Sequence, residues 1–280
     1  MVQVKAPVLC NRRIAPDHFM MRLKAPAIAS RSLPGQFIHV LCGEPAFLRR
    51  PFSLLDLDAK AGTVDFIYKQ VGLGTNVLSQ IPVSEKVDLL GPLGTPFKIP
   101  AGLKTAYLIG GGVGIPPLYL LAKVLVKSGG SRVRVKAFLG ARTSGWIVCA
   151  EMFRRLGVEV HLATDDGTLG WRGRVVDLLE KHLEMSSSRK RGSDSRFRGN
   201  DAALYICGPT PMMAAAAALA RREKLPAQVS LEERMGCAMG CCMGCVVEVT
   251  TEPLHSCARF QRVCTEGPVF PAEAIAWRKP

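Results

Sequence analysis

The sequence has no long uninterrupted hydrophobic run. Its first twenty residues contain no apolar stretch of the kind that secretory signal peptides carry. The longest apolar stretch, residues 101–126, is broken by a glycine cluster, two prolines and two lysines, so it is a poor candidate for a membrane-spanning helix. We therefore expect a cytoplasmic protein without membrane insertion. In that compartment ten cysteines indicate metal or redox chemistry rather than disulfides.

Acidic residues are scarce. The chain has 23 Asp and Glu against 37 Lys and Arg, which gives a formal net charge of +14. This charge suits nucleotide phosphates, an acidic partner surface or nucleic acid, and does not choose among them. With 48% apolar and 21% charged residues the chain is not disordered, and 280 residues indicate about two domains with room for a small third.

Helical periodicity is nearly absent from residues 1–100. Short alternating runs separated by Gly and Pro predict strands there, at 36–41, 63–68 and 86–90. Several short strands at this spacing favour a small antiparallel β-barrel. We therefore expect a first domain, residues 1–100, of this kind.

The pattern changes after Leu103. Apolar strand and helix candidates alternate, which predicts a doubly wound parallel sheet with helices on both faces over residues 101–228. The strands are expected at 105–109, 132–139, 158–163 and 203–207, and the helices at 115–126, 151–156 and 175–182. The polar, basic stretch 186–201 interrupts this pattern. We interpret it as a flexible surface insertion, with a nucleic-acid-binding arm as the less favoured alternative.

A third segment, residues 229–280, is short and rich in cysteine. Six of the ten cysteines lie between residues 237 and 264. Cys237, Cys242 and Cys245 have the C-x4-C-x2-C spacing of ferredoxin-type [2Fe–2S] sites. Glycines among them let the backbone curl around a cluster. The spacing leaves the fourth ligand open between Cys257 and Cys264, with Cys241 as a bystander.

Zinc is the main rival for these cysteines. Zinc sites usually contain paired C-x2-C units, and only one such pair is present. A zinc-containing nucleic-acid-binding protein would also account for the positive charge. That hypothesis gives no role to the glycine loops described next, so we favour an iron–sulfur cluster.

Two loops of the expected parallel sheet are suited to a dinucleotide. A glycine cluster follows the strand at 105–109 and opens a helix, so its backbone can approach a pyrophosphate. A Cys-Gly-Pro turn follows the strand at 203–207. Because ligands bind at the carboxyl ends of the strands in such sheets, both loops should face one crevice. The predicted residues are Gly110, Gly111, Gly112, Gly114, Cys207, Gly208 and Pro209.

The β-rich domain carries a flavin signal. In Arg50-Pro51-Phe52-Ser53 the arginine can pair with a pyrophosphate, and the turned strand and serine can hold the edge of an isoalloxazine ring. Gly72-Leu-Gly74-Thr75 offers backbone amides and a hydroxyl for phosphate. A purely structural role for either segment remains an alternative at this stage.

Taken together, these motifs resemble the ferredoxin–NADP⁺ reductase superfamily. More narrowly, they resemble the electron-transfer subunits of class B, NAD⁺-linked dihydroorotate dehydrogenases. The further segments that carry the resemblance are Ile67-Tyr68-Lys69, Leu231–Cys237 and Arg262–Phe270. The resemblance covers nearly the whole chain apart from 186–201, and Cys241 and Cys257 depart from the family's pattern.

The resemblance implies a set of roles. Residues 1–100 would bind FAD through Arg50–Ser53, Ile67–Lys69 and Gly74–Thr75, residues 101–228 would bind NAD, and residues 229–280 would hold [2Fe–2S]. Cys264, in Val-Cys-x-x-Gly-Pro-Val-Phe, would be the fourth ligand. No side chain of this chain would act as a catalytic residue.

The implied activity is that of an oxidoreductase subunit in pyrimidine biosynthesis. Electrons would pass from the FMN of a partner dihydroorotate dehydrogenase subunit through the cluster and FAD to NAD⁺, in a heterotetramer of two copies of each chain. The alternative is a flavin and iron–sulfur subunit of another NAD(P)H:ferredoxin-type oxidoreductase or of a hydrogenase-type complex. Neither includes nucleic acid as a partner.

Overall fold

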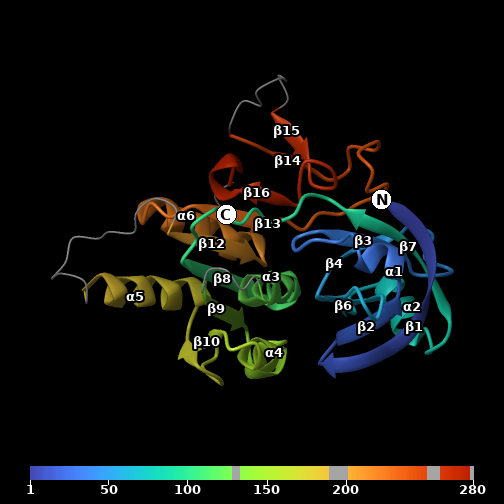
Figure 1. Cartoon of the computed structure of the whole chain (residues 1–280), viewed down its shortest axis with the longest axis horizontal. Helices are drawn as coiled ribbons and strands as arrows, with labels where there is room; N and C mark the ends of the chain where they lie inside the picture. Colours follow the sequence, from blue (N-terminus) through green and yellow to red (C-terminus); the bar gives the residue numbers. More distant parts are fainter. Residues whose placement is uncertain (128–132, 189–200, 251–258, 278–280) are drawn as a thin grey trace. The chain divides into compact units, whose positions relative to one another are not determined.

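The computed structural model describes residues 1–127, 133–188, 201–250 and 259–277 (Figure 1). These residues form two compact units. Unit 1 comprises Met1–Phe97, Leu231–Phe270 and Ala274–Ala276, and unit 2 is formed by Lys98–Ser230 with Pro271–Glu273 and the last residues. Cys257, one of the two candidates for the fourth ligand, lies outside the described residues, as does most of the predicted 186–201 insertion. No described helix is long and apolar enough to cross a membrane.

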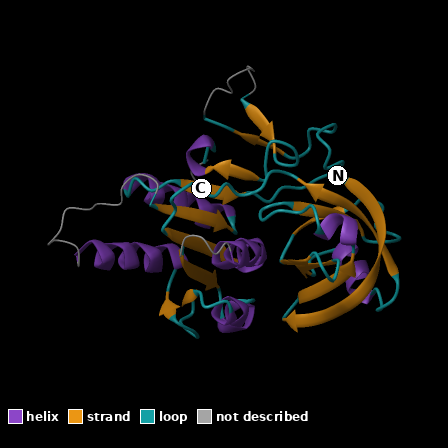
Figure 2. Ribbon diagram, in the orientation of Figure 1, coloured by secondary structure: helices purple, strands orange, loops and turns teal. Residues whose placement is uncertain are grey.

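Unit 1 begins with an antiparallel sheet, whose strands are drawn in orange in Figure 2. Its strand order is β4-β3-β7-β1-β2-β6-β5. Strand β7 shows why these residues form strands, because every second residue from Val87 to Leu93 is buried. The strands are β1 (Val2–Ala15), β2 (His18–Lys24), β3 (Phe37–Leu41), β4 (Arg50–Ser53), β5 (Asp56–Asp58), β6 (Thr63–Lys69) and β7 (Lys86–Leu93).

The sheet closes on itself. Phe52, on the edge strand β4, stacks on Phe66 of β6 with 4.9 Å between ring centroids. The Tyr68 ring, also on β6, lies 5.7 Å from the Phe52 ring. Since β4 and β6 stand near opposite ends of the strand order, this contact requires the sheet to curl. The antiparallel barrel-like domain predicted for this region is thus confirmed.

Two helices belong to the barrel, α1 (Pro26–Ala29) and α2 (Leu73–Gln80). Helix α2 was not predicted, because its buried positions are Gly74, Thr75 and Leu78, which form almost no apolar stripe. The segment Gly72–Thr75, predicted to offer backbone amides and a hydroxyl to a phosphate, forms the start of this helix. The Thr75 hydroxyl accepts the N–H of Val71 at 2.9 Å and of Gly72 at 3.2 Å, which caps this helix.

The cysteine-rich segment of unit 1 contains β14 (Val246–Glu248) and β15 (Phe260–Arg262), and it is followed by β16 (Val269–Pro271) and the short helix η3 (Ala272–Ala274). It is fastened to the barrel just beyond β7. The Thr95 N–H donates to the Gly267 carbonyl at 2.6 Å, and a methyl group on Gly94 would lie 2.4 Å from Pro268. Barrel and cysteine-rich segment therefore form one compact body.

Unit 2 is built on a parallel sheet in which β8 is central and buried throughout, as expected for a strand covered on both faces. Within Lys98–Ser230 the strand order is β11-β10-β9-β8-β12-β13. The strands are β8 (Thr105–Gly111), β9 (Arg134–Ala141), β10 (Glu159–Thr164), β11 (Trp171–Arg172), β12 (Ala202–Cys207) and β13 (Ala227–Ser230). The predicted strands and parallel pairing are confirmed, with small shifts at their ends.

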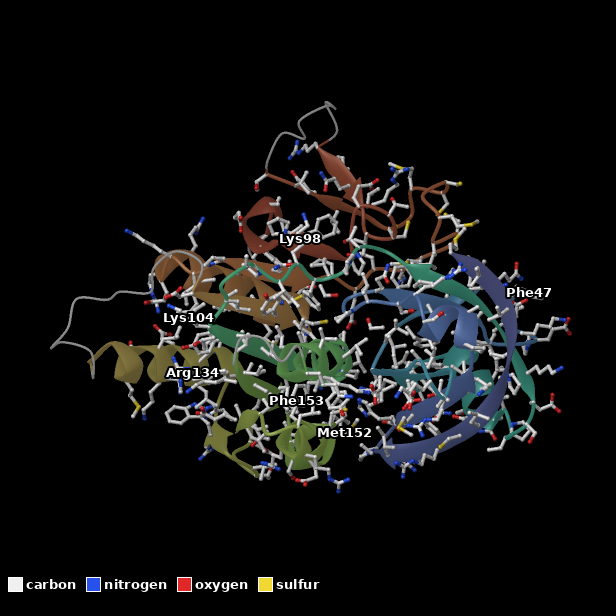
Figure 3. The ribbon with its side chains drawn as sticks, in the orientation of Figure 1. Phe47, Lys98, Lys104, Arg134, Met152 and Phe153 are labelled. Carbon is white, nitrogen blue, oxygen red and sulfur yellow. The ribbon has the colours of Figure 1, made fainter. Side chains whose placement is uncertain are left out.

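Helices cover both faces of this sheet (Figure 1). They are α3 (Ile115–Lys127), α4 (Ala150–Arg155), α5 (Val175–Ser188) and α6 (Thr210–Arg222), with short turns η1 (Gly112–Gly114) and η2 (Ser144–Trp146). Helices α3 and α4 meet through Tyr119 and Phe153, whose rings pack edge to face at 5.4 Å (Figure 3). Helix α5 runs six residues beyond its predicted end at 182, to Ser188, so it includes the start of the expected insertion.

The described end of that insertion is attached to unit 2. The Lys104 ammonium (labelled in Figure 3) pairs with the Asp201 carboxylate at 2.9 Å, and the Asp201 carbonyl accepts the N–H groups of Lys104 and Thr105. The chain thereby enters β12 in register with β8, where Gly110 pairs with Cys207.

Candidate functional site

The cysteine-rich loop of unit 1 directs backbone N–H groups at sulfur. The Cys237 sulfur accepts the N–H of Met239 and of Cys242, each at 3.4 Å, and the Cys242 sulfur accepts the N–H of Gly244 at 3.5 Å. These hydrogen bonds lower the pKa of Cys237 to about 6. A loop of this kind stabilises thiolates, which are the forms that ligate metals.

The four predicted ligands are brought together. Strand β15 pairs with β14 so that Arg262 stands opposite Val246, and the Val263 N–H donates to the Cys245 carbonyl at 2.9 Å. This places Cys264 beside Cys245. Burial, and then the neighbouring Cys245 thiol, raise the pKa of Cys264 to about 11, and Cys237 is also close enough to contribute.

Two glycines of this loop lie against a sulfur. A methyl group on Gly236 or Gly244 would lie 3.4–3.5 Å from the Cys242 sulfur, which is ordinary van der Waals contact. Ala238 and Met243 adopt left-handed backbone angles, with φ of 56° and 55°, which curl the chain between the cysteines. The donor set of four sulfurs with inward N–H groups fits an iron–sulfur cluster. Cys241 is exposed, and no described interaction of its sulfur ties it to this group.

The predicted flavin residues lie on the barrel in unit 1. The Arg50 guanidinium donates to the carbonyls of Leu48 at 2.8 Å and Arg49 at 3.1 Å. A methyl group on Gly74 would lie 3.2 Å from Arg50 Nε, so this arginine crosses the start of α2. Among the described residues no carboxylate pairs with it, in contrast to Arg49, which pairs with Asp88 at 2.8 Å. The arrangement leaves a cation next to backbone amides, which suits a pyrophosphate.

The other predicted flavin residues divide into two groups. Ile67 and Tyr68 are buried, and the Tyr68 hydroxyl donates to Asn11 Oδ1 at 2.9 Å, so their side chains serve the barrel core. Phe52 joins the same aromatic cluster through Phe66. The half-buried group consists of Arg50, Pro51, Phe52, Ser53 and Lys69. A flavin contact by any of these residues stays a prediction.

The nucleotide loops of unit 2 lie side by side. A methyl group on Gly114 would come within 2.4–2.5 Å of the Cys207 carbonyl group and the Gly208 nitrogen. A methyl group on Gly208, whose φ is 153°, would lie 2.9–3.0 Å from the backbone of Gly111. Because β8 and β12 are parallel neighbours, both loops emerge from the carboxyl ends of their strands. The two loops that the sequence predicted to share a crevice are thus adjacent, although Cys207 itself is fully buried.

A third loop follows β10. The Asp166 carboxylate accepts the N–H of Thr168 at 3.0 Å and its hydroxyl at 2.7 Å, and these bonds hold the pKa of Asp166 below its usual value. These bonds form a capping turn after β10. Asp165 stands next to it, at the carboxyl end of the same sheet.

A separate polar cluster in unit 2 contains Glu159, His161 and His182, whose ligand atoms lie within 4.8 Å of one another. The Lys136 ammonium already lies among them, 2.9 Å from Glu159 Oε2 and 3.3 Å from His182 Nε2. Since this cation fills the place that a metal ion would take, the cluster is a satisfied ion-pair network.

Sequence reasoning missed the ion pair that supports the cysteine loop. Arg262 and Glu266 flank Cys264, and their side chains join through two hydrogen bonds of 2.9 Å and 2.5 Å. The available signal was the spacing of four residues between opposite charges around a cysteine. Only the fold shows that the arginine also reaches Gly240, at 2.9 Å.

The fold and the motifs define a class of protein. Residues 232–276 match the family described as the iron–sulfur cluster binding domain of dihydroorotate dehydrogenase B, and residues 108–218 match the oxidoreductase NAD-binding domain. The solved structure of an NADH-dependent reduced ferredoxin-NADP oxidoreductase aligns with a TM-score of 0.81 and 28% identity over 98% of this chain and 90% of its own. The chain is thus an oxidoreductase of the ferredoxin–NADP⁺ reductase fold.

Whole-length relatives narrow the class. The electron transfer subunit of dihydroorotate dehydrogenase B (NAD⁺) from Bacillus caldolyticus is 41% identical over 274 residues, 96% of each chain. The protein of the same description from Desulforamulus reducens is 36% identical over 97% of each chain. The chain belongs to this family, the electron transfer subunits of NAD⁺-linked dihydroorotate dehydrogenase B, as the sequence motifs predicted.

Proposed function

We propose that this electron transfer subunit relays electrons from the FMN of a catalytic partner to NAD⁺ through a [2Fe–2S] cluster and FAD. The cluster ligands are Cys237, Cys242, Cys245 and Cys264. The observation that carries the proposal is the convergence of these four sulfurs in a segment fastened to the barrel that bears Arg50. When bound, the cluster and FAD supply one-electron transfer and its conversion to a two-electron hydride step.

The chain's own residues place and hold these groups. Arg50 binds the FAD pyrophosphate by charge-assisted hydrogen bonds, and strand β4 with Ser53 supports the ring. Two observations place this strand near the cysteine segment. Ser53 pairs in register with Phe37, and the Phe37 ring and Pro268 both close around Gly94. The flavin strand and the Cys264 segment are thus neighbours within unit 1.

The dinucleotide is held mainly by backbone. Gly110, Gly111, Gly112 and Gly114 let it approach the amino end of α3, and Gly208 opens the neighbouring turn. No side chain is required as a nucleophile or a general base, because the reaction moves electrons between bound groups. The proposal includes a cytoplasmic location, where thiols are kept reduced, and two copies of each subunit in the assembly.

The test is an anaerobic purification of the full chain with its catalytic partner. We expect about two irons, two acid-labile sulfides and one FAD per chain, and co-purification with an FMN-containing dehydrogenase. Stoichiometric zinc without iron would refute the cluster, and absence of FAD would refute the flavin site. Mass measurement of the complex tests the stoichiometry of two plus two.

A second function has one observation in its favour. The oxidoreductase structure that covers 98% of this chain is described as NADH-dependent reduced ferredoxin-NADP oxidoreductase. A chain of that function would reduce ferredoxin or NADP without a dihydroorotate-oxidising partner. Dihydroorotate-dependent NAD⁺ reduction by the purified complex distinguishes the two, because only the proposed relay requires it.

A further inference from the structure

We propose that Arg262 is a positioning residue for the cluster. Its guanidinium, held by Glu266, fixes Gly240 within the ligand loop and sets a positive charge beside Cys245 and Cys264. This inference rests on the proposed function, in which these cysteines hold the cluster. It concerns the residues around the ligands. It assigns to one ion pair both the shape of the ligand loop and part of the reduction potential of the cluster.

The Arg262–Glu266 pair is built as a rigid fork. The Glu266 carboxylate accepts Arg262 Nε at 2.9 Å, Nη2 at 2.5 Å and the Arg262 backbone N–H at 2.7 Å. Thr265 adds its hydroxyl at 3.0 Å. Bidentate pairing of this kind fixes the orientation of a guanidinium, which a single ammonium contact does not. The pair encloses Cys264, which lies between its two members in the chain.

The guanidinium nitrogen that does not bind Glu266 reaches the cysteine loop. Arg262 Nη1 donates to the Gly240 carbonyl at 2.9 Å. Gly240 has a φ of 85°, and a methyl group there would lie 3.0 Å from Thr265 Cγ2 and 3.1 Å from Arg262 Nη1, so this position requires glycine. The Gly240 backbone also lies close enough to Cys264 to favour its thiolate. The arginine therefore holds a residue whose backbone lies next to a ligand sulfur.

The same guanidinium lies close enough to Cys245 and Cys264 for their charges to interact with it. Four thiolates and two irons form a group that becomes more negative when it takes up an electron. A nearby cation stabilises that reduced state, and a nearby anion opposes it. Arg262 and Glu266 should thus shift the potential in opposite directions, even though both stabilise the same turn.

The chain supplies a matched control on the same strand pair. Arg259 also pairs with a glutamate, Glu248 of β14, but among the described residues its guanidinium makes no hydrogen bond or ion pair with the loop of residues 237–245. Arg259→Gln removes the same charge from the same hairpin. It therefore reports the effect of losing an arginine–glutamate pair without disturbing Gly240.

The experiment compares Arg262→Gln, Arg262→Lys, Glu266→Gln and Arg259→Gln in the anaerobically purified full chain. Iron and sulfide content are measured first, then the midpoint potential by an EPR-monitored redox titration, and then the rate of cluster loss to a chelator. We expect Arg262→Gln to lower the potential and to speed cluster loss several-fold. Glu266→Gln should raise the potential, and Arg262→Lys should keep it near the wild-type value while still speeding cluster loss.

The outcomes separate the possible failures. Potentials and loss rates of Arg262→Gln that match those of Arg259→Gln would overturn the role of Arg262 and leave the cluster intact. If the midpoint potential shifts in the same direction in Arg262→Gln and Glu266→Gln, the ion pair has only a structural role. That result would overturn the electrostatic part of the inference. If Arg262→Gln assembles no cluster, the Glu266→Gln potential decides: an upward shift supports the inference and no shift overturns it. A wild-type chain without iron would refute the proposed cluster itself.

Discussion

The two units position their candidate cofactors by different means. In unit 2 the nucleotide loops are backbone structures at the ends of adjacent buried strands, and glycines bring main chain against main chain. In unit 1 the candidate groups are side chains, four sulfurs and a guanidinium, from segments far apart in the chain. The two units should therefore be sensitive to different substitutions. Removing a side chain should damage unit 1, whereas adding one should damage unit 2.

The largest expected effect is on the sulfurs of unit 1. Cys264→Ser should abolish the cluster, since serine does not replace a buried thiolate ligand of iron. Iron, acid-labile sulfide and visible absorption of the purified chain measure this. Cys241→Ser, at an exposed cysteine of the same loop, is the control and should keep full iron content. Iron loss in the control with retention in Cys264→Ser would reassign the ligands.

The guanidinium of unit 1 comes next. Arg50→Ala should weaken FAD binding by about 1.5–3 kcal/mol, roughly ten- to hundred-fold in affinity, because a charge-assisted hydrogen bond is lost. Flavin release followed by fluorescence gives the affinity. Arg12→Ala, at an exposed arginine of β1, should leave FAD bound. Equal FAD affinity in both variants would remove Arg50 from the pyrophosphate site.

Unit 2 should respond to an added methyl group. Gly114→Ala places a Cβ 2.4–2.5 Å from the backbone of Cys207 and Gly208, where no flexible side chain can yield. We expect a loss of about 1–3 kcal/mol in unfolding free energy and weaker NAD⁺ binding, measured by thermal melting and ligand titration. Gly145→Ala is the control, because its Cβ would meet only Thr143 Oγ1 at 3.9 Å. Wild-type melting and NAD⁺ binding of Gly114→Ala would contradict the expectation that unit 2 is sensitive to added side chains.

The smallest effect concerns a buried histidine in the barrel. His39 is 1% exposed, and neither ring nitrogen has a hydrogen-bond partner among the described residues. Burial, and then the charge of Arg49, lower the pKa of His39 from 6.5 to about 4. The unfolded chain therefore binds a proton more readily, so stability is complete above pH 6.5 and is lost as the pH falls toward 4.

We expect this histidine to cost about 1–2 kcal/mol of stability between pH 7 and pH 5. His39→Leu removes the titrating group and should flatten the dependence of the melting temperature on pH over that range. His161→Leu, at a histidine of unit 2 that contacts Glu159, shows what loss of another histidine does. An unchanged pH profile in His39→Leu would show that His39 is not the group responsible.

Sequence reasoning succeeded where one element carries the whole signal. Strand β8, its glycine turn and helix α3 form a continuous pattern of apolar run, glycines and apolar helix, and all three were predicted. It failed at α2, whose buried face is made of Gly74, Thr75 and Leu78 and so carries almost no hydrophobic period. It also took Ser186–Ser188 as loop, although α5 continues through them.

The cluster ligands show the same difference between local and distant signals. The C-x4-C-x2-C spacing predicts three ligands of one loop, because nearby residues must converge whatever the rest of the chain does. The fourth ligand stayed open between Cys257 and Cys264 on spacing alone, and the resemblance favoured Cys264. The structure brings Cys264 beside Cys245 through the pairing of β14 with β15.

Local patterns and motifs were enough to predict the order of the parts, the family and the residue types available to each cofactor. Only the tertiary structure decided which distant groups meet: Arg50 with Gly74, Gly114 with Cys207, and Arg262 with Gly240. The physical reason is that such contacts depend on strand register and loop closure. These are set by burial and hydrogen bonding over the whole unit, and no short stretch of sequence contains them.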